Sequence, residues 1–146
     1  DIQLTLAQKI PVAGAVIVTT PQDIATLDAR RGIEMFRKVD ISVLGVVENM
    51  ALHVCSNCGQ VEHIFGAGGG ERIAREYQSE LLGSLPLNIK IREQADSGRP
   101  TVIAAPDSEA ALAYRQIARR VAARLAARPV TDKRAFPKVL MTSAEE

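Results

Sequence analysis

Two apolar runs with an amphipathic segment between them restrict this chain to few folds. Residues 14–20 (GAVIVTT) and 41–47 (ISVLGVV) are rich in β-branched side chains, and uninterrupted runs of this kind are typical of strands buried on both faces of a parallel sheet. Residues 22–39 place apolar side chains along one stripe at helical spacing and charged side chains on the opposite side. Strand, helix and strand in this order predict a right-handed βαβ unit.

The remainder of the chain continues the alternation of strands and helices. We expect, in order, a short helix over 71–79, a short strand over 81–85, a candidate edge strand over 101–105 and a long helix over 107–127 with Asp107 or Ser108 as its N-cap. This alternation predicts an α/β fold with three layers and a mainly parallel sheet. We expect residues 1–128 to form this domain, and residues 129–146, with two prolines and no periodicity, to form a flexible tail.

The charge balance and the cysteine usage exclude several classes of protein. The 146 residues include 18 basic and 17 acidic side chains, and a net charge of +1 gives no electrostatic basis for binding nucleic acid or an anionic membrane. No apolar run approaches the ~20 residues of a membrane-spanning helix, and no secretory signal is recognisable. The two cysteines form one Cys-x-x-Cys, which in the absence of an export signal predicts a cytoplasmic metal or redox pair rather than a structural disulfide.

The strongest local motif is HVCSNCG, residues 53–59, in the irregular stretch that follows the second strand. Cys55 and Cys58 are three positions apart in a loop closed by Gly59, which lets both sulfurs face one side, as zinc and iron–sulfur sites require. Three functions fit a lone pair: a redox dithiol, half of a zinc site or half of a cluster site. The redox interpretation is weakened because the pair does not begin a helix directly after a strand, and two unligated loop cysteines are the structural alternative.

The metal interpretations share a shortage of ligands. Zinc and [4Fe–4S] sites normally take four protein ligands, and Cys55 and Cys58 supply two. Either His53 and His63 complete a site within one chain, or a second copy of the chain contributes its own cysteine pair about a two-fold axis.

Further polar residues follow the predicted strands. Asn49 ends the second strand, where ligands of open α/β sheets bind, and its amide is complementary to the N6/N7 edge of adenine. Pro86, Leu87 and Asn88 end the next strand on the same side of the sheet. The structural alternative for Asn49 is a turn residue. The glycine-rich segment 66–71 (GAGGGE) is either an anion-binding helix start or, as we favour, a flexible hinge for the cysteine loop.

These motifs, taken in order, resemble the second half of Mrp/ApbC-type proteins, which are iron–sulfur cluster carriers in the MinD/ParA branch of P-loop ATPases. The resemblance extends from residue 1 to about residue 125 and is carried by AVIVTTPQDIATLDARRGIEMF, VLGVVENM, CSNCG, IFGAGGGERIA, LLGSLPLNIKIRE, GRPTV and PDS. It implies a fold of the P-loop NTPase type, of which this chain is the C-terminal portion. The sequence contains no G-x-x-x-x-G-K-[ST] phosphate loop, and the resemblance implies that this loop and the magnesium-binding residues precede Asp1.

Carried over by position, the resemblance makes Cys55 and Cys58 ligands of a [4Fe–4S] cluster that bridges a homodimer. It makes Asn49 an adenine contact and places Pro86, Leu87 and Asn88 beside the base; family members usually have Asp at the position of Asn88. It further implies ATP and Mg²⁺ binding in the complete protein and transfer of the cluster to apo-protein clients. We expect this chain alone not to hydrolyse ATP.

Two other functions remain open at this point. One is a zinc-stabilised interaction module in which the cysteines and histidines of each monomer bind zinc. The other is a ParA/MinD-like positioning ATPase with an incidental cysteine pair.

Overall fold

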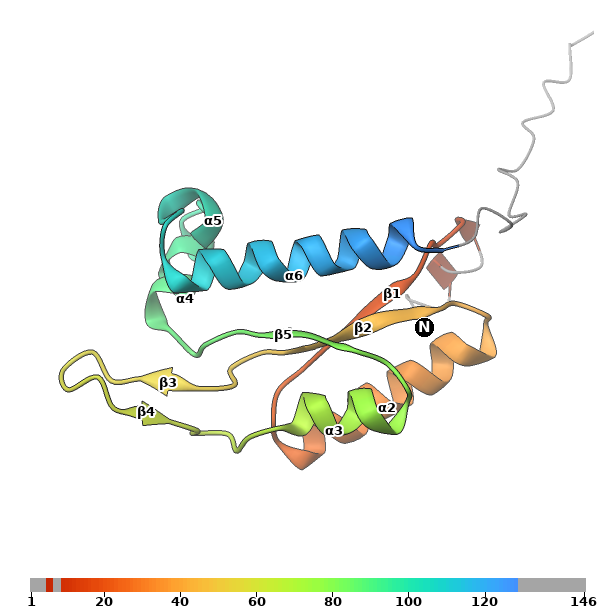
Figure 1. The fold of residues 1–146 in the computed structure, drawn as a ribbon, viewed down its shortest axis with the longest axis horizontal. Coiled ribbons are helices and arrows are strands. Elements are labelled where there is room, and N and C mark those ends of the chain that lie inside the picture. The colour runs from red at the N-terminus through yellow and green to blue at the C-terminus, as the bar shows by residue number, and fades with distance from the viewer. Residues whose placement is uncertain (1–4, 7–8, 129–146) are drawn as a thin grey trace, which may run out of the picture.

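Three parallel strands form the central sheet of the computed structural model, which describes residues 5, 6 and 9–128 (Figure 1). The strands lie in the order β1–β2–β5, and both pairings are parallel. Their bounds are Ala15–Thr19 for β1, Val43–Glu48 for β2 and Leu81–Ser84 for β5. The parallel α/β sheet that the apolar runs predict is therefore confirmed.

Helices cover both faces of this sheet and give the three layers expected. On one face lie α2 (Asp23–Lys38) and α3 (Gly69–Glu76), and on the other lies α6 (Glu109–Ala126), as Figure 1 shows. Neighbouring residues of β2 face opposite layers: Val46 packs with Ile33 of α2 and Ile73 of α3, whereas Val47 packs on the side of α6. Because successive side chains of a strand alternate between faces, a strand buried on both sides must be apolar throughout.

The outer edge of β1 has no neighbouring strand among the residues that the structure describes. Val16 and Val18, on this strand, are 37% and 61% exposed. Parallel strands are normally buried on both faces, and edge strands are normally protected by charged residues or by a covering element. Among the described residues, β1 is therefore unpaired along one edge, and the side chains of Val16 and Val18, which alternate with the buried Ile17, are open to solvent.

The segment between β5 and α6 differs from the expectation. Residues 101–105 do not form an edge strand; they include the short helix α5 (Thr101–Ala104), which follows α4 (Ile89–Asp96). Pro100 is the N-cap of α5 and accepts the hydrogen bond from the Ala104 N–H, while Thr101 is buried. Packing of α5 against α6 outweighs the β propensity of the Thr-Val-Ile run. The predicted N-cap of α6 is confirmed at Ser108, whose Oγ accepts from the Ala111 N–H at 3.2 Å.

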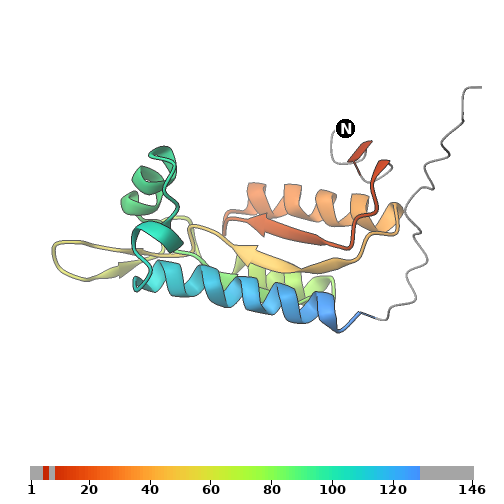
Figure 2. The ribbon, with the colours of Figure 1, turned by 90° about the horizontal axis from the view of Figure 1, so that it is seen from above.

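The irregular stretch between β2 and α3 contains a hairpin. Strands β3 (His53–Val54) and β4 (Val61–Glu62) pair antiparallel and, in both Figure 1 and Figure 2, project from the end of the molecule where α4 and α5 also lie. This is the end at which β2 finishes. We call residues 51–68, which include both strands, the cysteine hairpin. The expected tail, 129–146, lies outside the described residues.

None of the helices in the described part of the chain combines the length and apolarity needed to cross a membrane.

Candidate functional site

The two cysteines lie in a hydrogen-bonded turn at the tip of the cysteine hairpin. The Cys55 N–H donates to the Gln60 carbonyl and the Gly59 N–H donates to the Cys55 carbonyl, both at 2.9 Å. Gly59 has a φ of 73°, a left-handed conformation that favours glycine. Cys55 is partly exposed, Cys58 is exposed, and neither is in a disulfide. The turn therefore presents two free thiols to solvent.

The turn also favours the thiolate form of one cysteine. The backbone N–H of Cys58 and, next in effect, that of Asn57 donate toward the Cys55 sulfur and lower the pKa of its thiol. Hydrogen bonds to a charged form stabilise that form, and the thiolate is the form that binds metals and reacts as a nucleophile. Cys55 and Cys58 thus fit a soft metal centre in both chemistry and accessibility.

Both histidines form hydrogen bonds to the main chain at the base of the hairpin. His53 Nδ1 lies 3.1 Å from the Leu87 carbonyl oxygen, and His63 Nδ1 lies 2.8 Å from the Ala51 carbonyl oxygen. A carbonyl only accepts, so each ring donates from Nδ1. Within residues 5–6 and 9–128, no three His, Cys, Asp or Glu side chains gather to hold a metal ion. The structure brings the two cysteines together and leaves the histidines outside their site.

The hairpin is joined to the loop that contains Pro86. The Ala51 N–H donates to the Leu85 carbonyl at 2.9 Å, and the Leu87 N–H donates to the Leu52 carbonyl at 2.7 Å. These bonds, together with the His53 contact, place the start of the hairpin beside the residues that follow β5. The sequence gives no signal of this pairing, because the partners are more than thirty residues apart and neither segment forms a regular strand.

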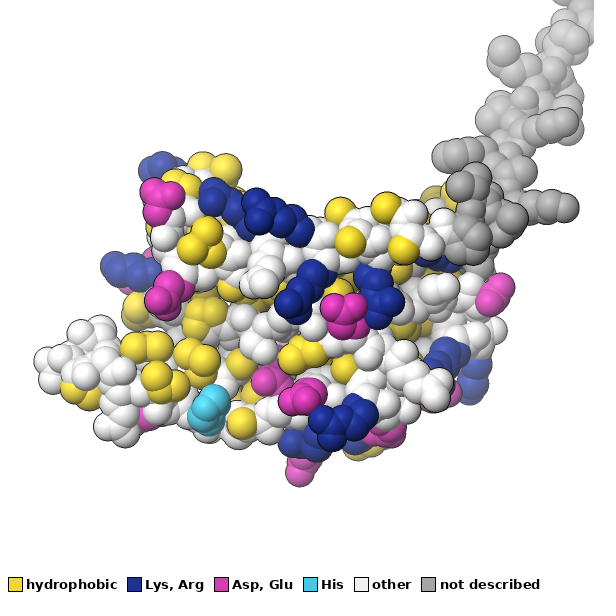
Figure 3. Space-filling view, viewed as in Figure 1, with side chains coloured by type: hydrophobic (Ala, Val, Ile, Leu, Met, Phe, Trp, Pro, Cys, Tyr) yellow, Lys and Arg dark blue, Asp and Glu magenta, His cyan; other side chains and the backbone are white. Residues whose placement is uncertain are grey.

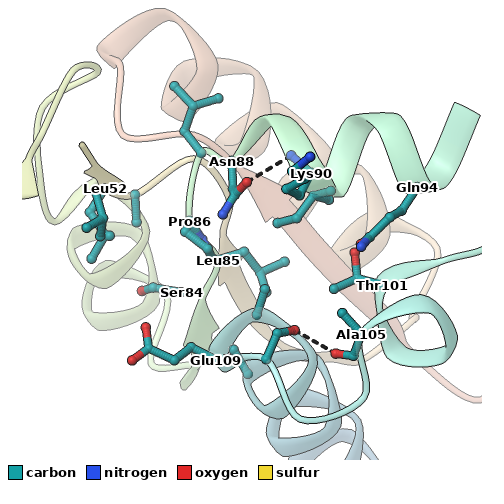
Figure 4. Close-up of a pocket in the computed structure, with 17 residues that line it drawn as sticks. Leu52, Ser84, Leu85, Pro86, Asn88, Lys90, Gln94, Thr101, Ala105 and Glu109 are labelled. Atoms are coloured by element: carbon teal, nitrogen blue, oxygen red, sulfur yellow. Dashed lines mark hydrogen bonds between the residues drawn. The ribbon is translucent and has the colours of Figure 1, made fainter. Parts of the chain in front are cut away.

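The residues expected near a nucleotide base line two cavities. Asn49 lines a cavity of about 470 Å³ along β1, and its Oδ1 accepts from the Met50 N–H at 3.0 Å. Pro86, Leu87 and Asn88 line a second cavity, of about 640 Å³, between the hairpin and helices α4, α5 and α6 (Figure 4). Asn49 and the Pro86 loop thus line different cavities of this pair.

Asn88 has a structural role that the sequence analysis missed. Its Oδ1 accepts from the Lys90 N–H at 2.8 Å and caps α4, as the dashed line in Figure 4 shows. Asn in front of a helix is a recognised N-cap signal, but the absence of periodicity over residues 88–106 concealed the helix.

The glycine-rich segment, for which we favour a hinge, is closely packed at its helical end. Gly69 and Gly70 are buried at the start of α3. A Cβ on Gly69 would lie 2.7 Å from the Pro21 carbonyl oxygen, and a Cβ on Gly70 would lie 2.9 Å from the Glu48 Cβ. The two glycines permit close packing, and the Gly70 N–H donates to the Glu48 carboxylate at 2.6 Å.

A parallel sheet covered on both faces, with polar residues at the carboxyl ends of its strands, defines a nucleotide-binding type of α/β fold. Solved structures agree with this class. A nucleotide-binding protein of Archaeoglobus fulgidus, determined in complex with ADP, matches with a TM-score of 0.58 and 38% identity over 66% of this chain and 40% of that one. The cell division ATPase MinD of Pyrococcus furiosus shares the fold, with a TM-score of 0.60 and 23% identity over 76% of this chain and 43% of that one.

The family follows from the sequence comparisons. A family model described as "ParA: NUBPL iron-transfer P-loop NTPase" matches residues 1–122, and the chain belongs to this family. An iron-sulfur cluster carrier protein of Pseudomonas fragi is 70% identical over 81% of this chain. The carrier protein of Escherichia coli K12 is 62% identical over 86% of it, and the iron-sulfur cluster transfer protein NUBPL of Mus musculus is 49% identical over 88%. The chain spans 41%, 34% and 40% of the lengths of these three relatives.

Proposed function

We propose that this chain is the cluster-binding portion of an iron–sulfur cluster carrier. The observation that carries the proposal is the pair of accessible thiols, Cys55 and Cys58, in a hydrogen-bonded turn that lowers the pKa of Cys55. Thiolates are the protein ligands of iron–sulfur clusters. The relatives named as cluster carriers or transfer proteins support the same cargo.

The cargo is a [4Fe–4S] cluster held between two copies of the chain. Such a cluster takes four thiolates, and each copy offers two. Hydrophobic side chains of the cysteine hairpin are exposed, namely Val54, Val61 and Ile64, each about half exposed, and Figure 3 shows hydrophobic side chains on the surface of this end of the molecule. A two-fold axis through the hairpin tips would bring four sulfurs together and cover these side chains. A cluster held near solvent by two thiolates from each copy is easily released to an apo-protein client.

In the complete protein, cluster handling is linked to ATP. Among the described residues, one edge of β1 is unpaired and suits pairing with a further strand, and we propose that a half bearing the phosphate loop pairs there. That half would hold the phosphates and Mg²⁺, while Asn49 and residues 86–88 would contact the base. The phosphate loop supplies most of the affinity of such sites, so this chain alone binds ATP weakly and does not hydrolyse it. Two free thiols suit a reducing compartment such as the cytoplasm.

Anaerobic reconstitution tests the proposal. With iron and sulfide, the 146-residue chain is expected to develop broad absorption near roughly 400 nm at about four irons per dimer. Cys55→Ala and Cys58→Ala each abolish it, because one thiolate per copy leaves only two ligands. The exposed Ser56→Ala, in the same turn, serves as the matched control and retains the absorption.

Other outcomes identify the alternatives. One tightly bound zinc per monomer with no iron uptake would establish the zinc-stabilised interaction module. A chain that binds neither metal would favour the positioning ATPase with an incidental cysteine pair.

A further inference from the structure

Glu48, the last residue of β2, is a buried acid. It is 5% exposed, and its Oε2 accepts the hydrogen bond from the Gly70 N–H at 2.6 Å. Burying a carboxylate is costly unless it is hydrogen-bonded. Gly70 lies in the first turn of α3, where the backbone N–H groups have no partner within the helix. The end of β2 thus supplies the hydrogen-bond acceptor that the Gly70 N–H lacks within α3.

The approach of Glu48 to α3 depends on residues with no side chain. A Cβ on Gly70 would lie 2.9 Å from the Glu48 Cβ and 3.3 Å from its Oε2. A Cβ on Gly69 would lie 2.7 Å from the carbonyl oxygen of Pro21, which follows β1. The start of α3 is therefore held against the carboxyl ends of two adjacent strands, and its Gly70 N–H is already occupied by an internal carboxylate instead of an external anion.

Glu48 also holds the neighbouring strand. Its carbonyl oxygen accepts from the Leu85 N–H at 2.8 Å, where β5 ends. The cysteine hairpin leaves the sheet just after Glu48 and returns at α3, which the Glu48 side chain binds. Glu48 therefore contacts both ends of the hairpin. Its carboxylate binds Gly70, just after the hairpin returns to the sheet. Its main-chain carbonyl binds Leu85, in the loop beside the residues where the hairpin begins.

We propose that Glu48 is a positioning residue that fixes the exit end of the cysteine hairpin to the end of β2, directly beside Asn49. That the hairpin binds an iron–sulfur cluster rests on the proposed function. The role of Glu48 in positioning the hairpin does not depend on it. Glu48 thus links two parts of the molecule. One is the end of β2, where Asn49 is proposed to contact the base, and the other is the segment that leads from the cysteines to α3.

Two substitutions distinguish the effect of the length of the Glu48 side chain from the effect of its charge. Glu48→Gln keeps the length of the side chain and an oxygen acceptor for the Gly70 N–H while removing the charge. Glu48→Asp keeps the charge but is one methylene shorter, so its carboxylate withdraws from Gly70. Glu80→Gln, which removes the carboxylate of the exposed ion pair with Arg124 (3.1 Å), is the control.

Hydrogen exchange of the apo chain is the first measurement. In Glu48→Asp, the amides of residues 61–72 are expected to exchange at least about tenfold faster, while those of α6 change less than about twofold, because the opening is local. Glu48→Gln and Glu80→Gln exchange like the wild type. A uniform increase over the whole sheet in Glu48→Asp would show a general stability role and overturn the proposal. Normal exchange in Glu48→Asp with fast exchange in Glu48→Gln would overturn it too, since charge rather than reach would then hold α3.

Cluster retention is the second measurement. Loaded protein is challenged with an iron chelator, and Glu48→Asp is expected to lose its absorption several-fold faster than the wild type, with Glu48→Gln unchanged. Equal loss from Glu48→Asp and the wild type would overturn the positioning role. If the wild-type chain takes up no cluster, the proposed function fails, and the exchange pattern alone decides the role of Glu48.

Discussion

The Nδ1 atom of His53 lies 3.1 Å from the carbonyl oxygen of Leu87, and this contact ties the cysteine hairpin to the loop that follows β5. The Leu87 N–H in turn donates to the Leu52 carbonyl at 2.7 Å. A displacement of residues 86–88 must therefore move the start of the hairpin or break these bonds. If this loop contacts a nucleotide base, as we propose, the contact is a direct route from the base to the thiols.

The same contact predicts that His53 is structural. Replacing His53 by Ala removes one partly buried hydrogen bond and is expected to lower the free energy of unfolding by about 1 kcal/mol, measured by urea titration. Reconstituted His53→Ala should keep its absorption near roughly 400 nm, because in the proposed arrangement the four ligands are all cysteines. His63→Ala, which loses the bond to Ala51, is expected to behave alike. Loss of the absorption in either variant would instead assign a histidine to the metal.

A pair of glycine substitutions tests the packing at α3. Gly70→Ala is expected to lower the free energy of unfolding by about 1–3 kcal/mol, because its Cβ would lie 2.9 Å from the Glu48 Cβ. Gly32→Ala, in the middle of α2 with no atom within 4 Å of its Cβ, is expected to raise it by about 0.5–1 kcal/mol. Urea titrations of both variants give the comparison. A neutral Gly70→Ala would contradict the close packing and favour the hinge interpretation of the glycine segment.

The sequence predicts the sheet well because parallel strands buried on both faces must be apolar throughout. The run at 14–20 contains β1, the run at 41–47 contains all of β2 except its last residue, Glu48, and the amphipathic segment between the runs contains α2. The run at 101–105 instead contains α5, which packs on α6 and buries Thr101 but leaves Ile103 65% exposed. A short apolar run alone does not distinguish a strand from a helix.

The candidate site is less predictable, because its contacts join residues distant in the sequence. The Cys55–Cys58 pair is a local motif and is visible as such. The bond between Glu48 and Gly70 spans 22 positions and depends on the close approach of two elements, which no periodicity reports. An acidic residue at the end of an apolar strand resembles a solvated strand end until the fold is known.

The lowered pKa of Cys55 predicts its reactivity. A thiol with a lowered pKa is ionised at a pH where an ordinary cysteine is still protonated. In Cys58→Ser, which leaves Cys55 as the only thiol and keeps the residue-58 N–H, alkylation by iodoacetamide should rise with pH and reach its plateau below the pH required by the same variant unfolded in urea. The pH–rate profiles of the two states give the apparent pKa values. Coincident profiles would show that the turn does not stabilise the thiolate.

Cluster loading is expected to shift monomer toward dimer. A ligand that binds one oligomeric state favours that state, and a bridging cluster binds only the dimer. Sedimentation velocity of apo and loaded chain measures the shift, and Cys55→Ala treated in the same way is the control. A loaded species that sediments as a monomer would contradict the bridging arrangement and favour His53 or His63 as further ligands.

The last prediction concerns Asn49 and the base. In a complete family protein that includes the phosphate loop, Asn49→Ala is expected to reduce the preference for ATP over GTP, because the amide contacts the base edge and not the phosphates. Loss of one hydrogen bond to the base costs about 1 kcal/mol, measured by calorimetry with both nucleotides. Asn57→Ala, an exposed substitution in the cysteine turn, is the matched control. If Asn49→Ala keeps the full preference for ATP over GTP, Asn49 is a turn residue, in keeping with its bond to the Met50 N–H. ATP hydrolysis by the 146-residue chain alone would contradict the assignment of the phosphate site to another half.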